Sequence, residues 1–385
     1  MTTPSSFAEY SRRLLAFMER GPAVAEAEFG GLARELFALQ FDHVPACRRL
    51  CEARGVTPDP LTNWRTIPAV PTTAFKELEL TSLAPAARTA VFHSSGTTEH
   101  RPSRHFHSAE SLAVYEASLL PWFARHVLPR AGDLQSPANA ASTPGGDCKS
   151  PARFLCLAPP PAQAPHSSLV HMFATVSRTF GPLDSRFVAT AGADNSWWLD
   201  FASTLAGLRH AEQSGQPLML LGTAFMFVHL LDELERRGLS IALPPGSRIM
   251  ETGGYKGRSR ELPKAELHAL ITSRLGVPPE FIVCEYGMSE LSSQAYDRVA
   301  GSASLLHPQS SIFSFPPWCR AIVTSPETGR EVAEGETGLL RIFDLANVRS
   351  VMAIQTEDLA VRRGEGFELL GRASHSESRG CSLLA

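Results

Sequence analysis

Apolar residues recur at three- and four-residue spacing in two N-terminal segments, residues 7–20 and 31–54. This spacing puts the apolar side chains on one face of a helix, so both segments are predicted to be α-helical. A further helix is predicted over residues 108–126. Residues 67–79 (IPAVPTTAFKELE) lack this spacing of apolar positions. They are predicted to be extended, with a short capped turn.

The middle of the chain alternates between short apolar runs and helical patterns. Strands are predicted at residues 217–222, 246–254 and 281–286, with helices between them at 224–238 and 259–275. Such alternation favours a mainly parallel sheet, in which the functional loops follow the carboxyl ends of the strands.

The pattern changes again near residue 312, where β-rich pieces are separated by glycine-containing turns. We therefore expect an α/β core at residues 1–310, a small β-rich subdomain at 311–372 and a flexible tail at 373–385. Residues 129–151 are rich in Pro, Gly, Ala and Ser and are expected to form a mobile surface loop.

Charge balance and cysteine content narrow the class of protein. The 385-residue chain has 36 Lys and Arg against 39 Asp and Glu, which argues against binding to nucleic acid or to a membrane surface through bulk charge. Seven cysteines spread over this length are typical of a reduced cytoplasmic protein. We find neither a signal-peptide pattern nor an apolar run of about 18 residues.

A cluster of small and hydroxyl-bearing residues follows a strand predicted at residues 88–95. Within HSSGTTEHRPSRHFH (93–107), this cluster consists of Ser94, Ser95, Gly96, Thr97 and Thr98. Hydroxyl groups around a glycine, together with the backbone N–H groups of the loop, can bind phosphate. The pattern is not the Walker loop, which ends in Gly-Lys-Ser/Thr, and an ordinary turn is the alternative interpretation.

A second motif, CEYGMSELSSQAYD (284–297), begins within the strand predicted at 281–286. Tyr286 could stack on a flat ring, while Ser289 and Glu290 could reach phosphate and its Mg²⁺. A carboxylate is the kind of hard oxygen ligand that Mg²⁺ takes alongside substrate phosphates. The alternative is a helix N-terminus that Ser289 caps, with Glu290 in the first turn.

Together, SSGTT and the distant EYGMSE resemble the adenylate-forming (ANL) superfamily, whose members make acyl-AMP from ATP and a carboxylic acid. The resemblance implies the α/β main (N-terminal) domain of that superfamily, with parallel-sheet subdomains and a small β subdomain. It also implies ATP and Mg²⁺ as cofactors, with Glu290 as the metal ligand. The nucleotide-binding residues it implies are Ser94, Ser95, Gly96, Thr97, Thr98, Gly253, Gly254, Glu285, Tyr286, Gly287, Ser289, Asp358 and Arg372.

Other segments match the superfamily in the same order. Gly253 and Gly254 stand where the superfamily lines the adenine pocket, and QTED (355–358) is similar to the segment whose aspartate holds the ribose hydroxyls. GETG (335–338) looks like a structural motif of the superfamily. Gly371-Arg372 resembles the pair that ends its main domain.

The narrower resemblance is to LuxE, the acyl-protein synthetases of bacterial fatty-acid reductase complexes. It is carried by VPTTAFKE, PHSSLVHM, ETGGYKGRSRELP, EYGMSELSSQAYD and the C-terminal SRGCSL, from about residue 40 onwards. In that family an acyl-AMP is formed, the acyl group moves to a cysteine near the C-terminus, and a partner reductase receives it. The resemblance therefore implies a fatty-acid substrate and an acyl reductase or other acceptor protein as partner.

Two features depart from the superfamily pattern. Only 13 residues follow Arg372 and no lysine follows Lys264, so the mobile C-terminal domain with its lysine is expected to be absent, as in LuxE-like proteins. The negative charge that develops on the α-phosphate must then be stabilised by other groups. The candidates are Mg²⁺ held by Glu290, the side chain of Lys256 and the side chain of Arg372. Glu99 replaces a glycine of the phosphate loop, where a carboxylate opposes triphosphate unless it turns outward or binds the metal.

Cys381 is the expected acyl acceptor, acting with Glu290 and Lys256 as the catalytic residues. A thiolate is the nucleophile, and Arg379 nearby can lower a cysteine pKa. Two alternatives stay open on the sequence. One is a coenzyme-A ligase of the phenylacetate–CoA ligase type, and the other is a non-catalytic subunit that binds an acyl group or a nucleotide.

Overall fold

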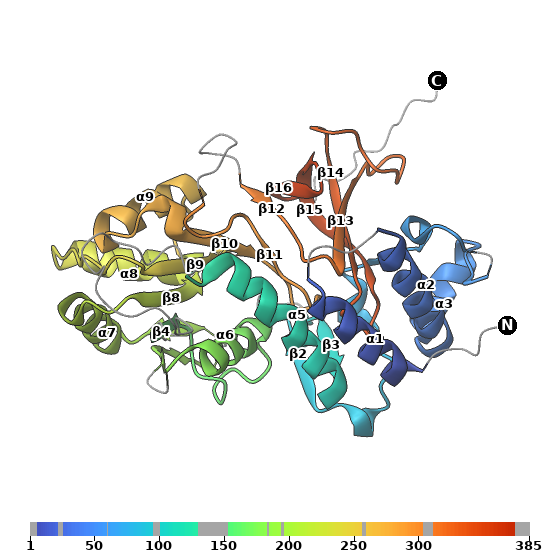
Figure 1. The fold of residues 1–385 in the computed structure, drawn as a ribbon, viewed down its shortest axis with the longest axis horizontal. Helices are drawn as coiled ribbons and strands as arrows, with labels where there is room; N and C mark the ends of the chain where they lie inside the picture. The colour runs from blue at the N-terminus through green and yellow to red at the C-terminus, as the bar shows by residue number, and fades with distance from the viewer. Residues whose placement is uncertain are drawn as a thin grey trace, which may run out of the picture.

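The computed structural model describes residues 6–21, 26–59, 61–94, 101–129, 153–182, 185–193, 196–255, 259–302 and 311–373. Two sheets with their helices lie side by side, and the N-terminal helices pack against the outer side of the second sheet (Figure 1). None of the described helices combines the length and the apolar character needed to cross a bilayer.

The first sheet, called the parallel sheet below, has the strand order β11-β10-β9-β8-β4-β5. All its strand pairs are parallel except the one between β10 and β11, so the predicted, mainly parallel sheet is confirmed. Its strands are β4 (Arg153–Leu157), β5 (Arg186–Phe187), β8 (Leu218–Thr223), β9 (Arg248–Thr252), β10 (Ile282–Tyr286) and β11 (Ala295–Tyr296).

Helices cover both faces of the parallel sheet, which explains why every residue of β8 is buried and why no polar side chain precedes Thr223 at its end. Successive residues of β8 point to opposite faces of the sheet. Leu220 packs with α7 (Phe201–Ser214), α8 (Ala224–Arg236) and α9 (Lys264–Leu275) on one face. Leu221 packs with α5 (Ala109–Val127) and α6 (Ser168–Phe180).

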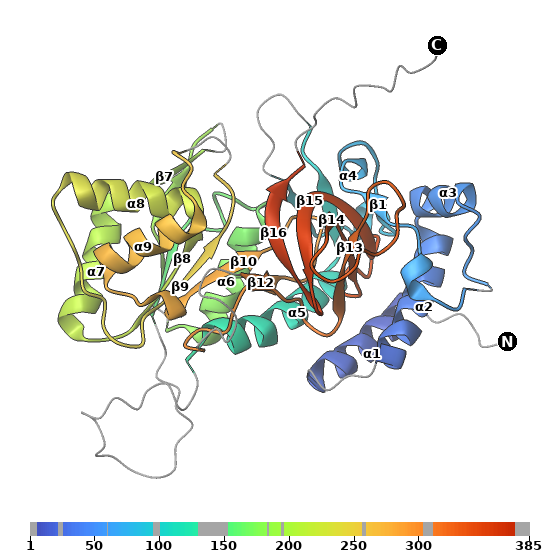
Figure 2. The same cartoon turned by 90° about the horizontal axis from the view of Figure 1, so that it is seen from above.

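The second sheet, called the antiparallel sheet below, stands between the parallel sheet and the N-terminal helices (Figure 2). Its order is β12-β16-β15-β14-β13, and the short β1 adds to β15 in parallel. Its strands are β1 (Val70–Pro71), β12 (Ile312–Phe313), β13 (Cys319–Thr324), β14 (Thr337–Asp344), β15 (Ala353–Arg363) and β16 (Gly366–Arg372). One hydrophobic core joins this sheet to the N-terminal helices α1 (Phe7–Glu19), α2 (Glu26–His43), α3 (Pro45–Ala53) and α4 (Ala74–Glu77).

Two hairpins complete the strands: β2 (Ala90–His93) with β3 (Arg104–His107), and β6 (Ala189–Ala191) with β7 (Trp197–Leu199). The remaining described elements are single 3₁₀ turns: η1 (Trp64–Thr66), η2 (Pro85–Ala87) and η3 (Pro279–Phe281).

The differences from the sequence prediction have local causes. The helix predicted over 31–54 is two helices, because Pro45 lacks an N–H and starts a new helix after Val44. The helix predicted over 259–275 begins only at Lys264, directly after Pro263. The prediction over 67–79 is confirmed in part: Val70–Pro71 is a strand, and the short turn is the helical turn Ala74–Glu77, although its N-cap residue Thr73 makes no side-chain cap bond. The loop predicted at 129–151 lies outside the described residues beyond 129.

A buried carboxylate ties the two sheets together. Asp344, at the end of β14, accepts hydrogen bonds from the backbone N–H groups of Ser292 (2.9 Å) and Ser293 (2.8 Å) in the segment between β10 and β11. It also accepts from the Ser293 hydroxyl (2.7 Å), which lies 2.9 Å from the hydroxyl of Ser118 on α5. The indole of Trp318 donates to that Ser118 hydroxyl at 2.6 Å. The segment after β10 is therefore held by α5 and by the antiparallel sheet.

We predict that Asp344→Ala lowers the free energy of unfolding by at least about 3 kcal/mol, because several buried donors lose a charged acceptor. Urea unfolding at pH 7 measures the change. Asp344→Asn keeps one acceptor oxygen and should lose clearly less. Equal losses in both variants, each below about 1 kcal/mol, would show that the carboxylate does not hold this segment.

Candidate functional site

The hairpin β2–β3 and the segment after β10 meet through direct hydrogen bonds. The Ser103 and Ser289 hydroxyl oxygens lie 3.2 Å apart, and His105 Nδ1 lies 3.0 Å from the main-chain oxygen of Ser289. Ser94 closes the base of the loop, because its hydroxyl accepts the Ser103 N–H at 3.0 Å. The two motifs singled out in the sequence therefore lie next to each other, although 186 residues separate Ser103 from Ser289.

Glu290 lies in this contact region and is 6% exposed. Its Oε2 accepts the Ser289 hydroxyl at 2.9 Å, and its main-chain oxygen accepts the side-chain amide of Asn347 at 2.9 Å. No helix begins here: residues 287–294 connect β10 to β11 as irregular chain, with a turn at Ser289 and Glu290. The alternative of a capped helix N-terminus at Ser289 and Glu290 is therefore wrong.

A second group of expected nucleotide ligands meets at the other end of the same segment. The Tyr286 hydroxyl donates to Asp358 Oδ2 at 2.7 Å, and Arg372 Nε lies 3.6 Å from Asp358 Oδ1. Asp358 and Arg372 are direct neighbours on β15 and β16. Burial, and then the adjacent Asp358 carboxylate, raise the pKa of Tyr286. The Tyr286 ring makes edge contacts with Phe313, Phe315 and Phe367, whereas the Arg372 side chain is 79% exposed.

Glycines border this end of the site. Gly253 and Gly254 follow β9, both are exposed, and Gly254 has a φ of +98°. A Cβ on Gly253 would have no neighbouring atom within 4 Å, so space is open beside it. A Cβ on Gly287 would collide with Glu285 Oε1, so the turn after Tyr286 accepts only glycine without rearrangement.

Glu285, also expected among the nucleotide ligands, is 5% exposed. Burial raises its pKa to about 7, against a smaller lowering by a hydrogen bond with the Thr252 side chain. Its charge in turn contributes to the raised pKa values of Tyr115 and Tyr296, which belong to the core beside α5 and α6. The structure therefore places Glu285 in the interior behind the site.

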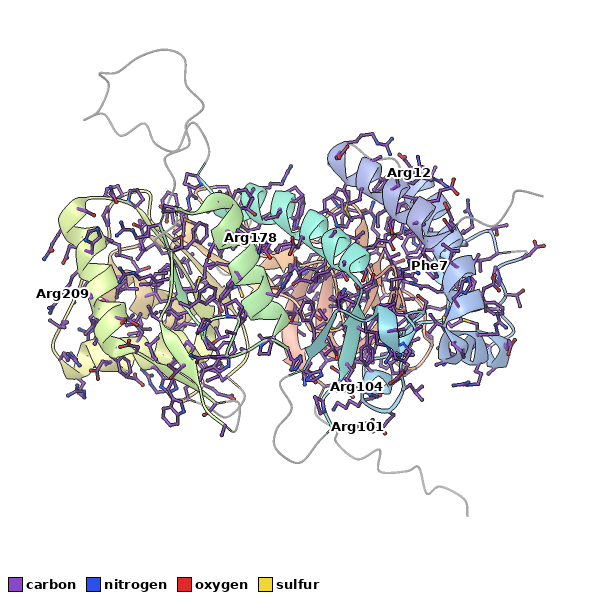
Figure 3. All side chains as sticks on the ribbon, turned by 90° about the horizontal axis from the view of Figure 1, so that it is seen from below. Phe7, Arg12, Arg101, Arg104, Arg178 and Arg209 are labelled. Atoms are coloured by element: carbon purple, nitrogen blue, oxygen red, sulfur yellow. The ribbon has the colours of Figure 1, made fainter. Side chains whose placement is uncertain are left out.

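Positive charge flanks the hairpin. Figure 3 shows Arg101 and Arg104 close together at the edge of the molecule where β2–β3 lies. Arg101 is exposed, and Arg104 Nη1 lies 3.6 Å from Glu79 Oε1. The remaining residues expected to act lie outside the described residues: Ser95, Gly96, Thr97, Thr98, Glu99, Lys256 and Cys381.

Four polar residues support the site without having been assigned a role from the sequence: Ser103, His105, Asp344 and Asn347. Ser103 and His105 stand within the phosphate-loop motif, where His105 and His107 alternate with partly exposed residues along β3. That alternation is a signal for one buried face. Asp344 and Asn347 carry no such local signal, because the partners through which they hold the segment after β10, Ser292, Ser293 and Glu290, are more than 50 residues away.

The chain matches the family model described as "Acyl-protein synthetase, LuxE" over residues 162–385. A Vibrio harveyi protein named long-chain-fatty-acid–luciferin-component ligase is 23% identical over 194 residues, which are 48% of this chain and 49% of that protein. An Aliivibrio fischeri protein of the same name is 24% identical over 199 residues, with the same coverage. The chain thus spans about half the length of the curated relatives it matches.

Solved structures of 2-hydroxyisobutyryl-CoA ligase share the fold. Its open conformation, in complex with 2-HIB-AMP and CoA, matches 92% of this chain and 77% of that chain at 16% identity and a TM-score of 0.59. The structure of its thioesterification state matches 92% of this chain and 70% of that chain, at 14% identity and a TM-score of 0.61. The fold is therefore that of adenylate-forming enzymes, as the sequence motifs predict.

The raised pKa of Glu285 predicts a pH-dependent stability. Its folded-state pKa of about 7 lies above the usual value of 4.5, so the folded protein keeps a proton that the unfolded chain loses between these values. The free energy of unfolding should therefore fall as the pH rises through this window. Glu285→Gln should remove this contribution and be more stable than the wild type at pH 8 by up to about 3 kcal/mol.

Urea unfolding of both proteins at pH 5 and pH 8 measures the effect. The difference between wild type and variant isolates the contribution of Glu285, because Asp344, whose pKa burial raises to about 6 in the wild type, is present in both proteins. An identical pH dependence of the two proteins would contradict the prediction.

Proposed function

The chain belongs to the LuxE family of acyl-protein synthetases, and on this premise we propose that it activates a fatty acid with ATP and captures the acyl group on Cys381. A carboxylate oxygen of the acid attacks the α-phosphorus of ATP, which releases pyrophosphate and leaves acyl-AMP. The Cys381 thiolate then attacks the acyl carbonyl carbon. The bond between that carbon and the phosphate oxygen breaks, and AMP leaves with the electron pair.

The observation that carries the proposal is the contact of the β2–β3 hairpin with Ser289 and Glu290. Ser103 and His105 bring the β2–β3 hairpin, between whose strands SSGTT stands in the sequence, beside a buried carboxylate. Backbone N–H groups and hydroxyls of such a loop bind phosphate, and Arg101 and Arg104 add positive charge beside it. In this arrangement the triphosphate of ATP lies between the loop and Glu290.

Mg²⁺ fits the donors at this place. The described residues hold no cluster of three or more His, Cys, Asp or Glu side chains that could bind a metal by themselves. A single carboxylate together with substrate phosphates is the ligand set that Mg²⁺ commonly accepts. Glu290 would hold the ion, which when bound neutralises charge on the phosphates.

The nucleoside part of ATP is proposed to lie along Tyr286, Asp358 and the exposed pair Gly253–Gly254. Asp358 accepts the Tyr286 hydroxyl, and a carboxylate with accepting capacity can also bind ribose hydroxyls. Arg372 is exposed beside Asp358, and with Lys256 it is our candidate to stabilise the α-phosphate.

The tail begins beside this proposed nucleotide site. Ala373 donates its N–H to the main-chain oxygen of Glu357 at 2.9 Å, next to the Asp358–Arg372 pair. Cys381 follows eight residues later, and at about 3.3–3.6 Å per residue an extended segment reaches up to about 29 Å. A thiol tethered at that distance meets the acyl-AMP within the same molecule, which replaces a bimolecular encounter.

The substrate class and the partner follow from the family. The curated relatives are named as long-chain-fatty-acid ligases, so a fatty acid is the proposed substrate. An acyl reductase, or another protein with an acceptor thiol, is the proposed partner that receives the acyl group from Cys381. The seven dispersed cysteines support a cytoplasmic location, where the thiol stays reduced.

We predict that Glu290→Gln lowers acid-dependent pyrophosphate release by about 10²–10³-fold, because it removes a positioned charge from the phosphate site. The amide can still accept the Ser289 hydroxyl, so the fold should be kept. Glu116→Gln, a partly exposed glutamate paired with Arg178 on α6, is the matched control and should release pyrophosphate like the wild type. Wild-type rates in Glu290→Gln at ordinary Mg²⁺ concentration would exclude the assigned role.

Cys381→Ala should separate the two half-reactions. Formation of acyl-AMP needs no thiol and should continue, while acyl-protein should disappear. Incubation with ATP and radiolabelled fatty acid, followed by denaturing gels with and without neutral hydroxylamine, measures the thioester. Cys381→Ser should behave like alanine, or carry a slow, hydroxylamine-resistant ester, because a serine hydroxyl is barely ionised at pH 7.

Label that persists in Cys381→Ala would move the acceptor to one of the other six cysteines, with Cys284 next to the site examined first. If no protein carries label and free coenzyme A is acylated instead, the coenzyme-A ligase alternative is correct. If no acid supports pyrophosphate release, the non-catalytic alternative is correct.

A further inference from the structure

Two histidines of β3 point into the protein beside the proposed phosphate loop. His105 is 2% exposed and His107 is 1% exposed, and their ring centroids lie 4.3 Å apart. Burial lowers the pKa of both rings, that of His105 to about 4. Both imidazoles are therefore neutral at pH 7. Their hydrogen bonds differ: His107 Nδ1 lies 3.4 Å from the Ser111 hydroxyl on α5, and His105 contacts the segment after β10.

The contact of His105 fixes its tautomer. Its Nδ1 lies 3.0 Å from the main-chain oxygen of Ser289, and a carbonyl oxygen can only accept a hydrogen bond. Nδ1 must therefore carry the single ring proton, and Nε2 carries none. The edge of Phe75, at a centroid distance of 6.4 Å, helps to pack the ring.

Ser103 makes a second contact from the same hairpin to the same residue. The Ser289 hydroxyl donates its one proton to Glu290 Oε2 at 2.9 Å. The Ser103 hydroxyl, 3.2 Å away, must then donate to Ser289. A chain of two hydroxyl groups therefore runs from the hairpin to the Glu290 carboxylate, and its direction is fixed.

Glu290 is thus held from both sides of its own backbone. On its N-terminal side, the main-chain oxygen of Ser289 accepts the hydrogen bond from His105, and the Ser289 hydroxyl accepts the one from Ser103. After its Cα atom, its carbonyl oxygen accepts the Asn347 amide at 2.9 Å. The β2–β3 hairpin and the carboxylate proposed to bind the metal are therefore connected through Ser289.

We propose that His105 is a positioning residue, which through its Nδ1–H bond to Ser289 sets the place of Glu290 relative to the β2–β3 hairpin. The proposal rests on the function proposed above. It goes beyond that function because it gives a role to a histidine outside the nucleotide site. That role is to align the segment that carries Glu290 with the β2–β3 hairpin.

The test uses three variants of the full chain. His105→Asn places a side-chain N–H near the position of Nδ1, whereas His105→Leu fills similar space without a donor. His107→Leu is the matched control, because it removes an equally buried imidazole from the same face of the same strand. For each protein, kcat and KM for MgATP are measured from pyrophosphate release, and Tm is measured by calorimetry.

His105→Leu should lower kcat by about 10–100-fold, and His105→Asn should restore it to within about threefold of the wild type. His107→Leu should lower Tm about as much as His105→Leu does, with kcat unchanged within about threefold. Equal loss of kcat in the Asn and Leu variants, or in both leucine variants, would overturn the proposal and leave packing as the role of His105.

A measurement without turnover separates this proposal from the proposed function. In ¹⁵N-histidine NMR spectra of the wild type at pH 7, the His105 ring should appear as the neutral tautomer with the proton on Nδ1. Another tautomer or a charged ring would overturn the proposal, whatever the activity. If His105→Leu does not fold, His105→Ala, which also lacks the donor, serves in its place, and an unchanged kcat in that variant would also overturn it. Absence of pyrophosphate release from the wild type, with the expected NMR signal, would refute the proposed function instead.

Discussion

The site depends on one buried carboxylate. Asp344 accepts hydrogen bonds from two successive backbone N–H groups, from the Ser293 hydroxyl and, at 3.0 Å, from the Ala346 N–H. Burial of a charge is costly unless donors surround it, so this set of donors and this carboxylate stabilise each other only when the two sheets are docked. The turns that contain Ser289 and Glu290 have no regular secondary structure of their own. Asp344 fixes their far end at Ser292 and Ser293, while Ser103, His105 and Asn347 hold Ser289 and Glu290.

This arrangement explains how three distant parts of the chain come together at the candidate site. The hairpin supplies the loop, the end of β10 supplies Tyr286 and Glu290, and β15 with β16 supplies Asp358 and Arg372. The carboxyl ends of parallel strands are a common place for ligand sites, and here the antiparallel sheet covers that edge on one side. Because β16 ends beside Tyr286 and Asp358, the chain that leads to Cys381 starts next to the proposed acyl-AMP.

The structure also connects the region that the family model matches with a hairpin that the model does not cover. The LuxE family model covers residues 162–385 and therefore does not include the hairpin β2–β3. Ser103 and His105 connect that hairpin to Ser289 inside the matched region. The hydrogen bonds thus extend the functional argument to the N-terminal part of the chain, within a fold that 2-hydroxyisobutyryl-CoA ligase shares over 92% of this chain.

The sequence by itself determined the mainly parallel sheet, the helices near 7–20, 108–126 and 224–238, and the two motifs that meet at the site. These features follow from local periodicity and from residue types that suit phosphate and ribose. It did not determine that Pro45 divides a helix, that α6 and α7 cover the sheet, or that Val70 pairs with Ile354.

Only the tertiary structure decided that Glu290 lies in a turn held by Asn347, and that His105 bonds to Ser289. The physical reason is that periodicity reports which face of an element is buried. The partner of a buried polar group is set by the docking of elements that lie far apart in the chain.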